Sequence, residues 1–186
     1  MVRFEKPYPA AFLDRDGVVN KIILKNGMPN PPDTIEKIRI LPGVKEAIEI
    51  LKRNGFVSVV ITNQPDIARG KISYESVAEI NDRIQGMTGI DYFYMCPHDD
   101  EPVCSCRKPK PGLIQSAVSE LNIDLRKSFL VGDRWRDIAA GQALGIPSYF
   151  INYNYDEKQP FKPYIEVSSL LEAVISVFGD SNDTSQ

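Results

Sequence analysis

Soft metal ligands and disulfide partners are scarce in this sequence. Its 186 residues include three cysteines and one histidine. A secreted domain held together by disulfides normally carries a larger, even number of cysteines, so this class is excluded and a reducing compartment is indicated. No apolar run approaches the roughly 20 residues that span a bilayer, and the first residues lack the apolar core of a signal peptide. We expect a cytoplasmic protein with no membrane partner.

The sequence also lacks an excess of basic residues. It has 22 Lys and Arg against 25 Asp and Glu, and a net charge of -3. Proteins that bind nucleic acids usually present a basic face, so we expect no nucleic-acid partner. The length and the hydrophobic share of 42% fit one globular domain. We expect that domain to span residues 1–179, to be monomeric, and to be followed by a flexible tail at 180–186.

Short apolar runs alternate with helical patterns along most of the chain. This alternation predicts an α/β fold in which a doubly wound parallel sheet is covered by helices on both faces. Residues 21–39 are rich in Pro and Asn, so we expect a loop over the end of the first strand, too short for a second domain. The predicted strands are 10–14, 56–62, 90–96, 128–133 and 147–152, and the predicted helices are 43–55, 74–87, 111–122, 136–145 and 168–178.

Two carboxylates follow the first predicted strand, in the string DRDG. Asp14 and Asp16 are two positions apart, so in a continuing strand their side chains share a face. Carboxylates held close together repel each other and need a cation or a shared proton. An ordinary Asp/Gly turn would also explain this string taken alone.

Polar residues follow the other predicted strands as well. The carboxyl ends of the strands in such a sheet form the edge where ligands bind. A helix cap or a solvated charge would explain each residue separately, but it is improbable that such explanations hold for all of them at one edge. The set comprises Thr62 and Asn63 as neutral donors to a phosphate oxygen, Arg107 and Lys108 as cations, and Asp133 and Asp137 as further acids.

These strings, DRDG, TNQ, RKP and GDRWRD, resemble the four motifs of the haloacid-dehalogenase-like phosphatases, in the same order from Asp14 to Asp137. The resemblance implies a Rossmann-like fold without a large cap domain. It also implies that Asp14 is the nucleophile and that Asp16 is the general acid and then the general base. Mg²⁺ would be held by Asp14, the backbone carbonyl of Asp16, and Asp133.

The resemblance assigns roles to the remaining residues of these motifs. Thr62 and Lys108 would hold the phosphoryl group during transfer, with Lys108 as a point charge against developing negative charge. Asp137 would orient Lys108 or a water on the metal. Arg107 and Arg134 would meet the substrate beyond the reacting phosphate, and the role of Arg69 stays open.

All three cysteines and the histidine lie within eleven residues, in the pattern C-x-H-x₅-C-x-C. Three thiolates and one imidazole complete a tetrahedral shell without an open position, which is typical of structural Zn²⁺. A redox pair of Cys104 and Cys106 is the minor alternative. We expect the ion to brace the loop that presents Arg107 and Lys108. The predicted zinc ligands are Cys96, His98, Cys104 and Cys106.

The string C-x-H followed by C-x-C-R-K-P is similar to zinc-bearing phosphatases that act on D-glycero-D-manno-heptose 1,7-bisphosphate or on histidinol phosphate. The string TNQPDIARG at residues 62–70 favours the heptose subgroup, although Pro65 and Asp66 depart from its usual pattern. We therefore predict release of the 7-phosphate from the heptose bisphosphate. Histidinol phosphate, the main alternative, would need acidic partners such as Asp99, Asp100 or Glu101.

Two further alternatives are less consistent with the residues. A DNA 3′-phosphatase shares the first motifs, but the chain lacks a basic stripe to follow the nucleic-acid backbone. A non-catalytic zinc-braced binding module would be expected to have lost at least one reacting residue, and all are present. The Tyr-rich segment 149–164 has no predicted function.

Overall fold

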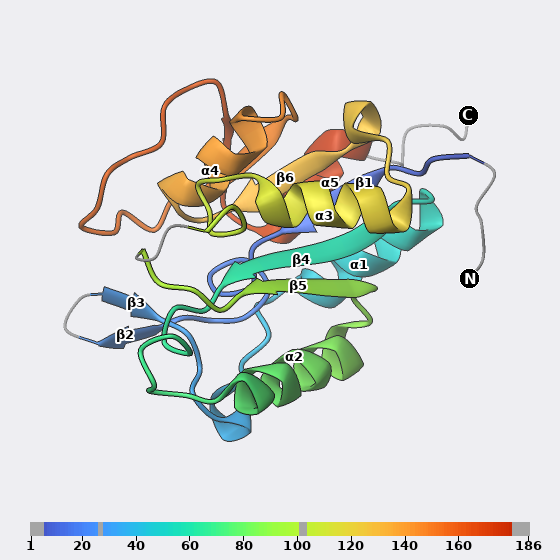
Figure 1. Cartoon of the computed structure of the whole chain (residues 1–186). Coiled ribbons are helices and arrows are strands. Elements are labelled where there is room, and N and C mark those ends of the chain that lie inside the picture. The colour runs from blue at the N-terminus through green and yellow to red at the C-terminus, as the bar shows by residue number, and fades with distance from the viewer. Residues whose placement is uncertain (1–5, 26–27, 101–103, 180–186) are drawn as a thin grey trace, which may run out of the picture.

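The computed structural model describes residues 6–25, 28–100 and 104–179, and its centre is a six-stranded parallel sheet (Figure 1). The strand order is β5-β4-β1-β6-β7-β8, so the chain winds outward from β1 in both directions. This order confirms the predicted doubly wound α/β fold. The strands are β1 (Ala10–Leu13), β4 (Val57–Asn63), β5 (Tyr92–Cys96), β6 (Phe129–Gly132), β7 (Ser148–Ile151) and β8 (Ile165–Val167).

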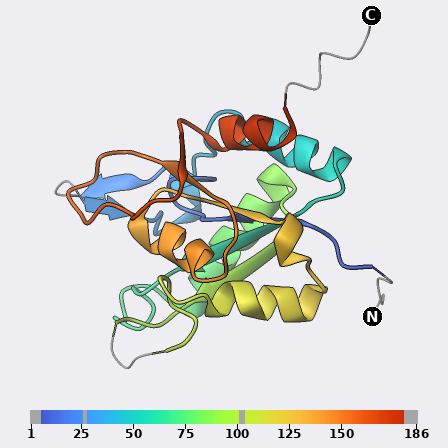
Figure 2. The ribbon, with the colours of Figure 1, turned by 90° about the horizontal axis from the view of Figure 1, so that it is seen from above.

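The helices cover both faces of this sheet, as Figure 2 shows for α1 and α5 on one side and α3 on the other. Successive residues of β1 alternate between the two layers: Phe12 packs in the α3/α4 cluster and Leu13 in the α1/α2/α5 cluster. The helices are α1 (Val44–Arg53), α2 (Tyr74–Thr88), α3 (Gly112–Leu121), α4 (Trp135–Gln142) and α5 (Leu170–Phe178), with short 3-10 turns at Ile35–Lys37 and Leu125–Lys127.

Residues 21–39 differ from the predicted loop, because they contain an antiparallel hairpin of β2 (Ile23–Lys25) and β3 (Met28–Asn30). Proline cannot donate a backbone hydrogen bond, and Pro29 lies inside β3, so the composition indicated a loop. Figure 1 shows the hairpin at the side toward which the strands of the sheet point. The hairpin is the only strand pair outside the main sheet in the described part of the chain.

Strand β8, which was not predicted from the sequence, has three residues and lies at the sheet edge. Ile165 and Glu166 are exposed, so the segment lacks the buried apolar run that marks the other strands.

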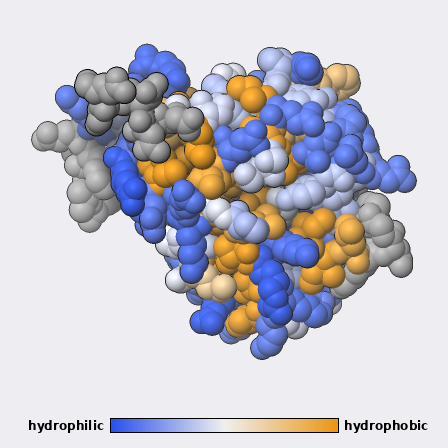
Figure 3. All heavy atoms as spheres, turned by 180° about the vertical axis from the view of Figure 1, so that it is seen from behind, coloured by the Kyte–Doolittle hydropathy of each residue, from blue (hydrophilic) through white to orange (hydrophobic). Residues whose placement is uncertain are grey.

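Figure 3 shows the outer surface on the side away from the viewer in Figure 1, where hydrophilic residues separate small apolar areas. In the described ranges no helix is long and apolar enough to cross a membrane. The predicted tail, 180–186, lies outside the described residues.

Candidate active site

The turn after β1 brings the first two motif carboxylates to the carboxyl edge of the sheet. Asp14 is buried, and its backbone N–H donates to the carbonyl of Val131 in β6 at 3.0 Å. Gly17 has a φ of +104°, and a Cβ there would lie 2.0 Å from Oδ2 of Asp133. Glycine is therefore required both for the turn and for the close approach of the loops after β1 and β6.

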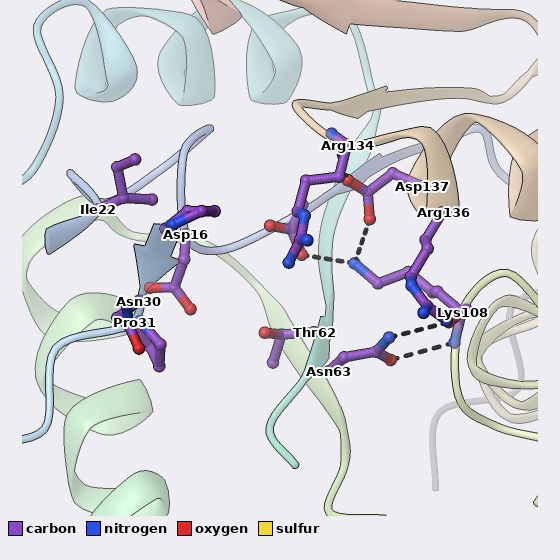
Figure 4. Close-up of a pocket in the computed structure, with 12 residues that line it drawn as sticks. Asp16, Ile22, Asn30, Pro31, Thr62, Asn63, Lys108, Arg134, Arg136 and Asp137 are labelled. Carbon is purple, nitrogen blue, oxygen red and sulfur yellow. Dashed lines mark hydrogen bonds and ion pairs between the residues drawn. The ribbon is translucent and has the colours of Figure 1, made fainter. Parts of the chain in front are cut away.

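Lys108 links two of the acids. Its side chain is buried, and Nζ lies 2.5 Å from Oδ1 of Asp14 and 2.6 Å from Oδ1 of Asp137 (Figure 4). Nζ also donates to the carbonyl of Ile61 at 2.7 Å. Burial alone would lower the pKa of Lys108, but the charges of Asp137 and Asp14 outweigh this and raise it. The site therefore contains a fixed positive charge beside Asp14.

The third acid, Asp133, is 1% exposed. Its Oδ2 accepts a hydrogen bond from the hydroxyl of Tyr155 at 2.8 Å, while its Oδ1 is buried and has no hydrogen-bond partner among the described residues. Burial, and then the charge of Asp14, raise the pKa of Asp133 well above its ordinary value. Burial likewise raises the pKa of Asp14 to about 7, although Lys108 opposes this. Lys108 alone therefore supplies too little positive charge to keep the pKa values of Asp14 and Asp133 in their ordinary range.

This arrangement fits a hard divalent cation. Side-chain oxygens of Asp14, Asp133 and Asp137 lie within 4.8 Å of one another. Both oxygens of Asp137 have other partners, since Oδ1 contacts Lys108 and Oδ2 accepts from the backbone N–H of Arg134 at 3.0 Å. Asp14 and Asp133 therefore remain as the side chains suited to Mg²⁺, which prefers oxygen ligands.

Asp16 is positioned by two residues to which the sequence analysis gave no role. Gln64 Nε2 donates to Oδ2 of Asp16 at 3.0 Å and to Oγ1 of Thr62 at 2.8 Å, so one amide ties the first motif to the second. Arg15 Nε donates to the same Asp16 oxygen at 3.0 Å. Oδ1 of Asp16 has no partner in the described part of the chain. Figure 4 shows Asp16 and Thr62 bordering one cavity.

Arg15 is completely buried, which is unusual for an arginine. Its NH1 donates to Oδ1 of Asn81 in α2 at 2.7 Å, and its NH2 lies 2.8 Å from Oδ2 of Asp16. The string DRDG gives its position next to the acids, but the partner in α2 is 66 residues away. Only the folded chain reveals that contact.

Asn63 holds the lysine loop rather than pointing freely into the cavity. Its Nδ2 donates to the carbonyl of Lys108 at 3.0 Å, and its Oδ1 accepts from the backbone N–H of Lys108 at 3.1 Å. Two reciprocal hydrogen bonds therefore fix the backbone of Lys108 to the end of β4. Contact between Asn63 and a substrate stays a prediction.

The start of α4 contributes two arginines to the cavity. Arg134 forms an ion pair with Glu157, and its Nε donates to the two carboxylate oxygens at 3.1 and 3.0 Å. The hydrogen bond to Glu157 raises the pKa of Arg134 further. Arg136, which the sequence analysis did not select, has its guanidinium 4.8 Å from the ring centre of Trp135. The cavity is lined by Asp14, Asp16, Ile22, Pro29, Asn30, Pro31, Thr62, Asn63, Lys108, Arg134, Arg136 and Asp137.

The other two predicted arginines lie on the zinc loop side. Arg107 Nε donates to Oδ1 of Asp100 at 2.9 Å. Arg69 makes two hydrogen bonds to the carboxylate of Asp99, at 2.6 and 2.7 Å. Neither arginine is among the described residues that line the cavity beside Asp14. Glu101, a possible partner for a cationic substrate, lies outside the described residues.

The predicted zinc ligands converge on one point. The sulfur of Cys96 lies 3.7 Å from that of Cys104 and 3.2 Å from that of Cys106, and Cys104 and Cys106 are 3.5 Å apart. Nδ1 of His98 lies 3.3 Å from the sulfur of Cys106 and 3.6 Å from that of Cys96. A tetrahedral ion with Zn–S bonds of about 2.3 Å would separate its sulfurs by roughly 3.8 Å. The four side chains therefore fit Zn²⁺.

A backbone hydrogen bond connects this cluster to the loop that carries Lys108. The N–H of Arg107 donates to the sulfur of Cys104 at 3.3 Å. Burial raises the pKa of the Cys104 thiol, but this donation and the neighbouring groups prevail and lower it to about 7. An ion at the cluster would therefore hold the residue that directly precedes Lys108.

Comparison with known proteins places these features in a family. Residues 30–145 match the haloacid dehalogenase-like hydrolases. A D-glycero-beta-D-manno-heptose-1,7-bisphosphate 7-phosphatase of Vibrio cholerae is 40% identical over 150 residues, 74% of this chain and 77% of the relative. The protein of the same name from Escherichia coli K12 is 38% identical over 156 residues, 76% of this chain and 77% of its own.

A solved structure shows the same architecture. The D,D-heptose 1,7-bisphosphate phosphatase of B. bronchiseptica, complexed with magnesium and phosphate, has a TM-score of 0.79 and 26% identity. The comparison covers 91% of this chain and 98% of that one. The similarity therefore extends over nearly the whole fold.

Proposed function

The chain belongs to the haloacid dehalogenase-like hydrolase family, and we propose that it is a magnesium-dependent phosphatase that removes the 7-phosphate from D-glycero-beta-D-manno-heptose 1,7-bisphosphate. The observation that carries the proposal is the buried Asp14–Lys108–Asp137 group beside Asp133, whose free oxygen suits a cation. The names of the relatives from Vibrio cholerae and Escherichia coli support this substrate.

The proposed reaction uses the roles that the family resemblance implies for Asp14 and Asp16. A carboxylate oxygen of Asp14 attacks phosphorus, the bond to the sugar oxygen breaks, and Asp16 gives that oxygen its proton. Asp16 then takes a proton from a water molecule, whose oxygen attacks the phosphorus of the aspartyl-phosphate. Phosphate leaves and Asp14 is regenerated. Gln64 and Arg15 hold one oxygen of Asp16, which leaves Oδ1 for the proton transfers.

Asp14, Asp133 and the backbone carbonyl of Asp16 would hold Mg²⁺. When bound, the ion reduces the repulsion between the anionic nucleophile and the phosphate. Lys108 supplies a second, permanent positive charge next to Asp14, and Asp137 keeps it in place. Thr62 lies at the cavity wall, where its hydroxyl can donate to the phosphoryl oxygens.

A bisphosphate substrate requires cations beyond the reacting phosphate, and the cavity has two. Arg134 is paired with Glu157, so a second phosphate would have to compete with that carboxylate. Arg136 has a longer contact, 3.5 Å from Oδ1 of Asp100, which is itself largely exposed. Exposed ion pairs of this kind are weak, so Arg136 is the more readily available guanidinium. We assign it to the non-reacting phosphate together with Arg134.

The cavity is less suited to histidinol phosphate. A cationic substrate needs unpaired acids near the reacting phosphate. Asp99 is paired with Arg69, Asp100 is paired with Arg107, and neither acid belongs to the described lining of the catalytic cavity. The cavity lining beyond the reacting acids is basic instead.

The proposal is tested by measuring phosphate release with Mg²⁺ from a panel of esters. The panel contains both anomers of the heptose bisphosphate, histidinol phosphate, and common sugar monophosphates. We expect the beta bisphosphate to have the highest kcat/KM. Replacing Arg136 with Ala should raise KM for the bisphosphate by roughly 10-fold, the effect of one lost charge-assisted contact, and change KM for a monophosphate less.

The Asp14→Asn variant serves as the control for the chemistry, because its amide cannot form the acyl phosphate. We expect it to lose activity by about 10⁴-fold while keeping its fold. Wild-type activity in Asp14→Asn contradicts the mechanism. A higher kcat/KM for histidinol phosphate than for either heptose anomer contradicts the substrate.

A further inference from the structure

The connection between β7 and β8 contains most of the Tyr-rich segment that had no predicted function. Figures 1 and 2 show this connection, in orange, extending toward the side where the β2–β3 hairpin lies. Its first part, residues 152–157, contacts the turns that carry the catalytic acids. We call residues 152–157 the tyrosine strap.

The two tyrosines of the tyrosine strap contact the loops after β1 and β6. The hydroxyl of Tyr153 donates to the backbone carbonyl of Gly17 at 3.0 Å. The hydroxyl of Tyr155 donates to Oδ2 of Asp133 at 2.8 Å. The two rings stack on each other, with centroids 5.6 Å apart and planes 26° from parallel. The strap therefore connects both acid-bearing loops through one pair of packed side chains.

The end of the tyrosine strap is fastened to the residue after Asp133. Glu157 accepts hydrogen bonds from Nε of Arg134 at 3.1 and 3.0 Å, and it also pairs with NH2. The Glu157 side chain is 13% exposed and that of Arg134 is 34% exposed, so the pair is partly shielded from water. The contacts of Tyr155 and Glu157 thus lie on consecutive residues of the β6 loop.

The carboxylate of Asp133 has two distinct oxygens as a result. Oδ2 is occupied by Tyr155, whereas Oδ1 is buried and has no partner in the described part of the chain. A carboxylate that binds a metal through one oxygen needs a donor on the other to fix its orientation, and such outer contacts strongly affect metal affinity. Asp137 cannot replace Asp133 as the metal ligand, because its two oxygens already contact Lys108 and the backbone N–H of Arg134.

We propose that Tyr155 is a positioning residue for magnesium: its hydroxyl fixes one oxygen of Asp133 so that the other faces the ion. Tyr153 supports the ring of Tyr155 but does not touch a carboxylate ligand. This inference rests on the magnesium dependence in the proposed function. It goes beyond that function because it assigns a role to a segment outside the four motifs.

The test is a calorimetric titration of the full-length, zinc-loaded protein with MgCl₂ in the absence of substrate. Replacing Tyr155 with Phe removes a single oxygen atom, and we expect it to weaken Mg²⁺ binding by about 10–100-fold. The activity of this variant should recover at high Mg²⁺ concentration with an unchanged KM for the ester. Tyr155→Met is a second variant with the same expectation.

Tyr153→Phe is the matched control, because it removes the neighbouring hydroxyl of the same stacked pair. We expect its Mg²⁺ affinity to stay close to the wild-type value. Wild-type Mg²⁺ affinity in Tyr155→Phe would overturn the inference. Equal weakening in both Phe variants would also overturn it, because packing of the strap rather than the Asp133 hydrogen bond would then be responsible.

The same titration separates this inference from the proposed function. A wild-type protein that binds Mg²⁺ but hydrolyses none of the esters contradicts the function, while the comparison of the two Phe variants still decides the role of Tyr155. A wild-type protein that does not bind Mg²⁺ contradicts both. Urea unfolding of each zinc-loaded variant without Mg²⁺ verifies that the fold is intact.

Discussion

At the scale of single residues, Lys108 determines the electrostatics of the site. Its buried ammonium contacts Asp14 and Asp137, and its backbone is held by Asn63. Taking charges out of water is costly, and the ion pairs of Lys108 with Asp14 and Asp137 offset part of this cost. The lysine therefore contributes to the stability of the edge, in addition to the catalytic role that we propose for it.

Replacing Lys108 with Met should lower the free energy of unfolding by about 3–5 kcal/mol in metal-free buffer above pH 7, because two buried carboxylates lose their counter-charge. The loss should shrink at acidic pH, where the raised pKa of Asp14 lets it take up a proton. Urea unfolding measures both values. The control is Lys71→Met, since the Lys71 side chain is 63% exposed. An effect of Lys108→Met no larger than that of Lys71→Met contradicts the expectation.

At the scale of elements, the cysteine loop between β5 and α3 links the candidate zinc ligands to the candidate active site. Cys104 accepts a hydrogen bond from the N–H of Arg107, and Lys108 follows directly. The described residues of this loop contain no helix or strand, so we expect the ligands that close the loop to determine its shape. The role of zinc in bracing this loop stays a prediction. An experiment that removes zinc but leaves Asp14 in place can distinguish this role from a role in the chemical step.

Removing zinc should loosen this loop and raise KM for the proposed substrate by roughly 10-fold, because small misplacements of positioning groups reduce binding and rate. Asp14 stays in place, so residual turnover should persist. The measurement is steady-state kinetics on protein whose zinc content is verified before and after chelation, alongside Cys104→Ser. Ser105→Ala, between two of the ligands, is the control. Full activity in a zinc-free protein would refute the brace.

At the scale of the whole molecule, the doubly wound sheet gathers residues that are far apart in the sequence at one edge. Asp14 follows β1, Thr62 is in β4 and Asp133 follows β6, and these three strands are neighbours in the sheet. Three acids then lie close together with one lysine, which costs stability when no cation is bound. Stability of the whole fold should therefore depend on both pH and Mg²⁺.

The sign of this dependence follows from the raised pKa of Asp14, which moves from 3.8 to about 7 on burial. Between these values the metal-free native state binds more protons than the unfolded state, so its stability should fall as pH rises. Bound Mg²⁺ keeps the carboxylates ionised and removes this loss. We therefore expect the increase in Tm on adding Mg²⁺ to grow with pH across this range, as measured by calorimetry.

The Asp133→Asn variant provides the control for this whole-molecule effect, because it removes one charge and one ligand. Its Tm should respond little to Mg²⁺ at any pH in the range. A wild-type Tm shift that is equal at both ends of the range would show that Asp14 and Asp133 do not titrate as their burial implies.

Light scattering would test separately whether the protein is the monomer that we predict.

Local strings of apolar, acidic or soft-ligand residues were enough to predict the fold class, the four motifs and the clustering of the three cysteines with His98. Tertiary structure decided what these strings could not encode. The β2–β3 hairpin forms despite Pro29, and the Tyr155 hydroxyl meets Asp133 across 22 residues of chain. Gln64 donates hydrogen bonds to both Asp16 and Thr62, and Glu157 forms an ion pair with Arg134. Such contacts depend on the distances between side chains at the sheet edge, which are fixed only when the strands pack side by side.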